Sequence, residues 1–291
     1  MPSAISAIRI VHPRTVGPVG RLAIRSLHTE LVLSPKPGLV SPLDPGSHTD
    51  MDAGTFVRSM FALRCYFVDI AAAGAAGAPF RDLQALGQLA ERRMLRATNG
   101  INTHRGAIFS LGLIAAAASW LIRRRRSLAG DSIGRSVSSL WGSEIAAARA
   151  SSPEATSHGL MVAGRYGVGG AREEACAGFP SIWSVGLPTI RHTIGQTRNK
   201  RLALIQSLFS LMAELDDTNV LYRGGRSGLT LVRASAQEFL DCGGVYRHDW
   251  EAHALSVHRR VTSLGLSPGG SADMLAASWF IYQVQKTYAW V

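Results

Sequence analysis

Cysteine is scarce in this sequence, and so are signals for metal ligation. Cys65, Cys176 and Cys242 are an odd number and have no C-x-x-C spacing, so they indicate neither a disulfide framework nor a zinc site. Three histidines near the C-terminus are five residues apart, whereas zinc-binding pairs on one helical face are four apart. These absences favour a reducing, cytoplasmic setting.

Long hydrophobic runs are also missing. The first residues, MPSAISAIRIVHPRTVG, contain no uninterrupted apolar stretch of the kind found in a secretory signal. The most apolar segment, 107–122, has 16 residues and is shorter than the ~20 needed to cross a bilayer. We therefore expect this segment to be a buried core helix, and we expect no membrane partner.

Lysine is rare, yet the chain is strongly basic. Only Lys36, Lys200 and Lys286 occur, so the net charge of +11 and the isoelectric point near 10.4 come almost wholly from arginine. Such a charge predicts an anionic partner, which could be nucleic acid, a membrane surface or a phosphorylated small molecule.

Strand patterns are scarce, whereas Ala, Leu and Arg recur at helical spacing. The pattern predicts one all-α domain spanning 1–291, with about ten helices and a loose N-terminus over 1–16. The predicted helices are 17–32, 53–76, 80–97, 105–124, 133–149, 181–194, 199–215, 228–242, 246–264 and 271–288.

Polar loops rich in Gly, Asp, Asn and His separate several of these helices. The four most unusual are 35–52, 98–107, 216–228 and 266–273. The first reads PKPGLVSPLDPGSHTDMD, and its prolines and glycines predict an ordered loop of unusual shape. The Gly- and Ser-rich segment 151–170 is typical of a mobile connector or lid. If the four polar loops meet at one end of the helical domain, they form a cleft.

Five motifs in these loops carry a family likeness. PKPGLV, GSHTDMD, NGINTHRGAIFSLG, DDTN with a nearby RGG, and SPGGSAD occur in this order between about residues 30 and 280. In this respect the chain resembles the triphosphoribosyl-dephospho-CoA synthase family. Ser41 and the GSH at 46–48 resemble the members that serve malonate decarboxylase more than those that serve citrate lyase. Arg105 stands where the family pattern has lysine, so a bidentate donor replaces a point charge.

The resemblance implies a reaction and a set of partners. ATP and 3'-dephospho-CoA would be joined by attack of the 2'-hydroxyl of dephospho-CoA on C1 of the ATP ribose, with release of adenine. The product would be the precursor of a prosthetic group, passed to a transferase that loads it onto an acyl carrier protein. Magnesium is the expected cofactor, because the triphosphate is kept intact and needs charge compensation.

The chemistry needs carboxylates and a route for protons. By analogy with glycoside cleavage, the transition state resembles an oxocarbenium ion that one carboxylate stabilises, while another accepts the proton of the hydroxyl. The catalytic candidates are Asp52, Asp50 and His48. Magnesium prefers carboxylates and water, and its candidate ligands are Asp50, Asp216 and Asp217, with Asp273 as a weaker candidate.

Cations and helix N-termini are expected to hold the anionic substrates. The predicted substrate-binding residues are Lys36, Asn102, His104, Arg105, Arg223, Gly224, Gly225, Arg226, Gly269 and Gly270.

Each of these motifs also has a purely structural interpretation. Asp50 or Asp52 could cap the helix that follows, and Asn102 or Thr103 could cap the helix beginning at Arg105. Arg223 could compensate the acids at 216–217, whose position at a helix C-terminus opposes the dipole. The arginine run 123–126 suits a solvated helix end, where cations are favourable.

Two other functions remain open at the level of sequence. One is a magnesium-dependent hydrolase similar to the ADP-ribosylglycohydrolases, in which water replaces the attacking hydroxyl. The other is a basic nucleic-acid-binding protein, which would explain the net charge but not the acid-rich loops, so nucleic acid is the less expected partner.

Overall fold

The computed structural model describes residues 13–150 and 158–289, and within these ranges it contains twelve α-helices and no strand. The predicted all-α class is thereby confirmed. The first helices are α2 (Pro13–Leu31), α3 (Ala53–Ala76), α4 (Phe80–Ala97), α5 (Arg105–Arg123), α6 (Ser132–Ala150), α7 (His158–Tyr166) and α8 (Gly170–Cys176). After a π-helical turn at Ile182–Gly186 follow α9 (Leu187–Thr197), α10 (Lys200–Glu214), α11 (Thr218–Asp241), a 3-10 turn at Gly244–Tyr246, α12 (Trp250–Ser263) and α13 (Gly269–Thr287).

The predicted helices 53–76 and 80–97 coincide with α3 and α4, but three predictions need correction. The loop expected over 216–228 is largely helical, because α11 begins at Thr218 and continues, with a kink at Gly225, to Asp241. Of the expected loose N-terminus 1–16, residues 13–16 are helical and belong to α2, while residues 1–12 lie outside the described ranges. The expected connector 151–170 contains α7, and its residues 151–157 lie outside the described ranges.

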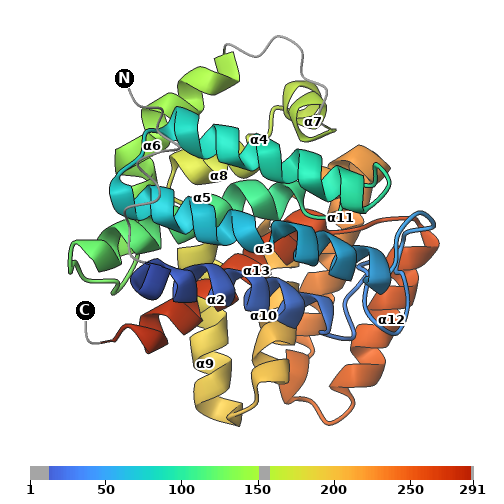
Figure 1. Cartoon of the computed structure of the whole chain (residues 1–291). Helices are drawn as coiled ribbons and strands as arrows, with labels where there is room; N and C mark the ends of the chain where they lie inside the picture. The colour runs from blue at the N-terminus through green and yellow to red at the C-terminus, as the bar shows by residue number, and fades with distance from the viewer. Residues whose placement is uncertain (1–12, 151–157, 290–291) are drawn as a thin grey trace.

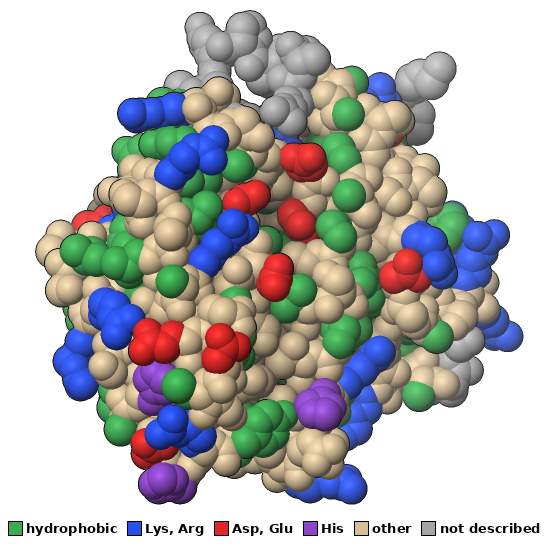
Figure 2. Space-filling view, turned by 180° about the vertical axis from the view of Figure 1, so that it is seen from behind, with side chains coloured by type: hydrophobic (Ala, Val, Ile, Leu, Met, Phe, Trp, Pro, Cys, Tyr) green, Lys and Arg blue, Asp and Glu red, His purple; other side chains and the backbone are tan. Residues whose placement is uncertain are grey.

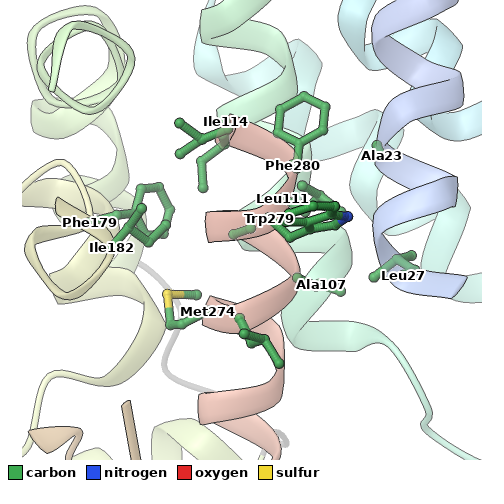
Figure 3. Packing of buried hydrophobic residues seen from close by; sticks show 14 of the residues in the cluster. Ala23, Leu27, Ala107, Leu111, Ile114, Phe179, Ile182, Met274, Trp279 and Phe280 are labelled. Carbon is green, nitrogen blue, oxygen red and sulfur yellow. The ribbon is translucent and has the colours of Figure 1, made fainter. Parts of the chain in front are cut away.

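Helix α13 lies at the centre of the fold. It packs against α2, α5 and α10, and Figure 3 shows its Phe280 and Trp279 between Leu111 and Ile114 of α5 and the side chains of α2. Phe280 is fully buried, as are the alanines in the middle of α5. The apolar segment 107–122 is therefore a core helix, as predicted from its length.

Helices α3 and α5 are long and apolar enough to span a membrane by composition, yet both are mostly buried within the fold. They run side by side with α4 (Figure 1). The contact between α3 and α5 is close at Gly74, where an added Cβ would lie 2.2 Å from the carbonyl oxygen of Ala116. A larger residue at this crossing would push the two core helices apart.

The proline-rich loop 32–52 is tied to the C-terminal part of the chain by side-chain hydrogen bonds. Ser47 Oγ donates to the carbonyl of Leu266, and His258 Nδ1 lies 2.9 Å from the carbonyl oxygen of Lys36. The peptide bond between Ser34 and Pro35 is cis. The loop is thus held in one shape against α12 and the segment before α13, and it presents Lys36 to the interior.

Candidate active site

A pocket open to solvent lies where four helices begin. Its cavity volume is about 120 Å³, which is less than the roughly 300 to 1,000 Å³ of typical small-molecule sites, and its mouth is open to solvent. Its wall contains Phe56 from the first turns of α3, Gly106 from α5, Asn219 from α11 and Gly269 from α13. Each helix N-terminus carries a partial positive charge, which the carboxylates of Asp52 and Asp217 compensate at α3, α11 and α13. The N-terminus of α5 beside Arg105 is therefore the most favourable position for an anionic ligand.

All four polar loops contribute to this pocket. Six of the residues predicted to bind substrate or to act in catalysis line it: Lys36, His48, Asn102, His104, Arg105 and Gly269. Asp273, the weaker candidate for a magnesium ligand, lines it as well. Residues Glu30, Phe56, Asn219 and Ser267 also line it, although sequence reasoning did not select them as site residues. A signal existed for Asn219, in the DDTN motif, and for Ser267, in the SPGGSAD motif.

Lys36 and Glu30 form an ion pair in the wall of the pocket. Nζ of Lys36 lies 2.6 Å from Oε1 of Glu30 and donates a second hydrogen bond, of 2.8 Å, to the backbone carbonyl of Glu30. Burial lowers the pKa of the Lys36 ammonium, and the carboxylate of Glu30 opposes this shift. Lys36 is therefore fixed in position by its partner, and the Glu30 carboxylate compensates its charge.

His104 is the N-cap residue of α5 and is buried beside Phe56. Its Nδ1 lies 2.7 Å from Ser59 Oγ and 3.1 Å from Thr103 Oγ1, and its ring meets that of Phe56 edge to face. Burial lowers the pKa of His104 to about 3, and the nearby charge of Lys36 adds to the effect. The imidazole is therefore neutral at physiological pH.

His48 is held between two loops. The guanidinium of Arg223 can only donate hydrogen bonds, so its contact of 3.0 Å with Nδ1 leaves the imidazole hydrogen on Nε2, which donates to Ser267 Oγ at 3.0 Å. Burial and the charge of Arg223 lower the pKa of His48, while Asp50 at 3.6 Å opposes this shift. His48 thus faces the pocket as a neutral ring.

Arg105 and Asn102 organise the N-terminus of α5. The Asn102 side chain accepts a hydrogen bond from the backbone N–H of Arg105, as the capping interpretation predicts. The guanidinium of Arg105 pairs with Glu91 of α4 at 2.5 Å, while its Nε is buried without a hydrogen-bond partner. An unsatisfied donor beside the pocket is available to a ligand.

Asp217 holds two helices together. Oδ1 accepts hydrogen bonds from the backbone of Asn219 and Val220 in α11, and Oδ2 accepts from the N–H and the hydroxyl of Ser271 in α13. Burial raises its pKa, and these hydrogen bonds act in the opposite direction. One carboxylate thus caps both N-termini, and it does not line the pocket.

The other predicted acids also lie outside the pocket wall. Asp52 caps α3 in a reciprocal arrangement with Thr55, whose hydrogen bonds lower the pKa of the Asp52 carboxyl. Asp216 pairs with Arg233 at 3.1 Å, and Asp50 is exposed beside His48. The described residues contain no cluster of three or more His, Cys, Asp or Glu that could hold a metal ion.

The glycine and arginine motif of α11 is used mainly in packing. An added Cβ at Gly224 would lie 2.4 Å from Leu266, and Gly225 has a φ of 60° at the kink. Arg223 donates to the carbonyls of Ser47 and Gly265, and Arg226 donates to the carbonyl of Tyr166 in α7. Of the remaining predicted residues, Gly270 packs against Asp217.

Basic side chains are distributed over the surface. On the face shown in Figure 2, lysine and arginine alternate with acidic side chains and form no continuous patch. In the arginine run, Arg124 and Arg126 stack on the ring of Trp120. Arg124 also donates a hydrogen bond to the carbonyl of Ala75 in α3. This part of the net charge therefore lies at an exposed helix end.

Comparison with known proteins identifies the family. Residues 17–291 match the ATP:dephospho-CoA triphosphoribosyl transferase family. The chain belongs to this family. The predicted enzyme class, a transferase that uses ATP and makes a prosthetic-group precursor, is thereby confirmed, and ATP and dephospho-CoA are the substrates that the family implies.

Curated relatives cover nearly the whole chain. A protein of Acinetobacter calcoaceticus is 38% identical over 267 residues, which is 92% of this chain and 91% of the relative. A protein of Vibrio cholerae is 36% identical over 280 residues, covering 93% and 89%. Both carry the name "Probable 2-(5''-triphosphoribosyl)-3'-dephosphocoenzyme-A synthase". No solved structure matches the chain.

Proposed function

We propose that the pocket at the four helix N-termini binds ATP and is the place where dephospho-CoA attacks C1 of its ribose. The observation that supports this most directly is the meeting of α3, α5, α11 and α13 at one cavity that also contains Lys36 and Arg105. Triphosphate carries several negative charges, and helix N-termini with nearby cations are the usual protein groups that bind phosphate. The retained triphosphate then acts as a handle that fixes the position of the ribose.

The apolar part of the wall suits the adenine base. Leu39, Val40, Met51 and Phe56 give it an apolar surface on which a purine can stack, and His104 lies beside Phe56. Nδ1 of the neutral His104 ring contacts the hydroxyls of Ser59 and Thr103, and we assign the ring hydrogen to Nε2. A donor at this position would stabilise the negative charge that develops on the adenine nitrogens as the glycosidic bond breaks.

Magnesium remains a proposal, and the predicted ligands do not form a preassembled site for it. The oxygens of Asp217 already accept four hydrogen bonds, and Asp216 pairs with Arg233. Magnesium is commonly held by substrate phosphates with one or two carboxylates. A magnesium requirement in this enzyme would therefore follow from the ATP complex rather than from a site built by the protein alone.

The catalytic roles predicted for Asp50, Asp52 and His48 also remain predictions. Of these three, His48 lines the pocket, and its neutral ring is positioned to donate or accept a hydrogen bond but not to supply charge. Asp52 is part of a helix cap. A role in catalysis for either aspartate would require the loop 32–52 to move when substrate binds.

The finer assignments are the malonate decarboxylase branch, a cytoplasmic location and transfer of the product to an enzyme that loads an acyl carrier protein. The branch rests on Ser41 and on the GSH motif, whose Ser47 and His48 both contact the segment before α13. The location is supported by the absence of a disulfide among the three cysteines, all of which are described. Reconstitution with either carrier protein would distinguish the branches.

The test of function is a reaction with defined products. Purified protein given ATP, 3'-dephospho-CoA and Mg²⁺ is expected to release adenine and to form a product heavier than dephospho-CoA by one triphosphoribosyl unit, as read by chromatography and mass spectrometry. Adenine release without dephospho-CoA would instead support a hydrolase. Intact ATP with folded protein, together with salt-sensitive retention on DNA, would favour the nucleic-acid-binding alternative.

A further inference from the structure

Two carboxylates line the pocket among the residues that the structure describes, and their surroundings differ. Glu30 is paired with Lys36 at 2.6 Å, so its charge is compensated and its oxygen is occupied. Asp273, in the second turn of α13, makes no hydrogen bond or ion pair within the described ranges, although it lies in the same wall. An acceptor without a partner in a substrate pocket is a group whose partner is expected to be the substrate.

The position of Asp273 is fixed by contact with the start of α5. A Cβ added to Gly106 would lie 1.9 Å from Oδ2 of Asp273, so the carboxylate occupies the space that a side chain at position 106 would fill. This contact brings the first turn of α5 against the second turn of α13 at the pocket. Asp273 therefore lies beside the helix end to which we assign phosphate binding.

Other aspartates near the pocket are already committed to structural contacts. Asp217 caps α11 and α13, and Asp52 caps α3. Asp216 pairs with Arg233 outside the pocket wall. By comparison, Asp273 combines access to the cavity with an unoccupied carboxylate.

We propose that Asp273 is the general base that accepts the proton of the dephospho-CoA 2'-hydroxyl during attack on the ATP ribose. The inference rests on the proposed function. The bond between the 2'-oxygen and ribose C1 forms, and the bond between C1 and N9 of adenine breaks, with N9 keeping the electron pair. The hydroxyl proton goes to Asp273, adenine takes up a proton from water, and Asp273 returns its proton to solvent.

The electrostatic setting of Asp273 suits this role. Loss of water around the carboxyl, with the nearby charges of Glu30 and Asp217, raises its pKa well above the ordinary value. A base is most effective when its pKa approaches the working pH, and an ordinary aspartate is too acidic for that. The charged or titratable groups around it come from α2, the loop 32–52, α5 and α11: they are Glu30, Lys36, His104, Arg105 and Asp217.

The experiment compares Asp273→Asn and Asp273→Ala with a control, Asp131→Asn, which removes an acid from an exposed pair with Arg135. Single-turnover adenine release with dephospho-CoA should fall by about 100- to 10,000-fold in both Asp273 variants and stay unchanged in the control. The Kd for ATP and the melting temperature should change little. Formate added to Asp273→Ala should restore part of the rate, because it can occupy the vacated space and accept the proton.

The pH dependence provides a readout that a structural role would not affect. The wild-type rate should fall as the pH drops through the pKa of Asp273, and this limb should vanish in Asp273→Asn. A normal rate and profile in Asp273→Asn, or a loss of rate without rescue by formate and with an unchanged profile, would overturn the assignment. If the wild-type protein itself forms no triphosphoribosyl product, the proposed function fails instead.

Discussion

His104 lies beside the apolar wall to which we assign the adenine base, so its charge state matters there. With a pKa near 3 in the folded protein and an ordinary value of 6.5, it favours folding only as the neutral form. Its contribution is therefore complete above about pH 6.5 and is lost as the pH falls toward 3. The histidine itself does not titrate in the range where the enzyme would work.

We expect the free energy of unfolding to drop by about 4 kcal/mol through this residue between pH 6.5 and 3, from about 1.36 kcal/mol per unit of pKa difference. His104→Gln should flatten the acid limb of stability measured by urea unfolding, whereas His248→Gln at an exposed position should not. An identical acid limb in His104→Gln would show that the imidazole is not held neutral.

At the same scale, sequence motifs located the basic and neutral polar residues of the pocket better than its acids. Lys36, Asn102, His104 and Arg105 lie in the pocket because rigid loops and a helix N-terminus present them there. Glu30 could not be found in this way, since it lies in the last turn of an amphipathic helix and belongs to no motif. In sequence, Asp52 was a catalytic candidate and Asp273 only a weaker candidate for a magnesium ligand, and only contacts across the fold show that Asp52 caps a helix while Asp273 lines the pocket.

Among the elements, the junction of α11 and α13 depends on one carboxylate. Replacing Asp217 with Ala leaves the two buried N-termini without their shared acceptor, so we expect a loss of roughly 1 to 4 kcal/mol, since each cap contributes about 0.5 to 2. Asp52→Ala removes an exposed cap and should cost less. Thermal and urea unfolding of both variants measure the difference, and equal losses would contradict the double-cap role.

A glycine at the crossing of α3 and α5 can be compared with a glycine in α4. Gly74→Ala should destabilise the protein by about 1 to 3 kcal/mol, because the new Cβ would meet the backbone of Ala116. Gly87→Ala in α4 meets nothing closer than 3.8 Å and should instead stabilise by up to about 1 kcal/mol through helix propensity. Urea midpoints of the two variants should therefore move in opposite directions, and a shift in the same direction would contradict the packing described.

At this scale, the sequence predicted helices best where apolar spacing and caps agreed, as in α3 and α4. It failed at the start of α11, where Gly224 and Gly225 resemble a loop. There the side chain of Leu266 packs so close to the helix that a side chain at position 224 would collide with it. Gly225 adopts a positive φ at the kink, which glycine tolerates. Local propensity was outweighed by a contact some forty residues away in sequence.

For the whole molecule, the pocket joins segments from α2 to α13, so a ligand bound there should stabilise the fold as a unit. ATP at 100 times its Kd should raise the free energy of unfolding by about 2.7 kcal/mol. CTP has no purine to stack on the apolar wall, so it should raise the free energy of unfolding less at equal concentration. Calorimetric melting with each nucleotide measures this, and equal shifts would show that the base does not enter the pocket.

The sequence by itself determined the all-α class, the ordered polar loops and the family, because helical periodicity and motifs are local properties of the chain. Only the tertiary structure decided which loop residues share a cavity and which cap helices. The reason is physical: a carboxylate near a helix N-terminus has the same local pattern whether it caps that helix, as Asp52 does, joins two helices, as Asp217 does, or faces an open pocket, as Asp273 does. The outcome depends on burial and on donors brought in by distant segments.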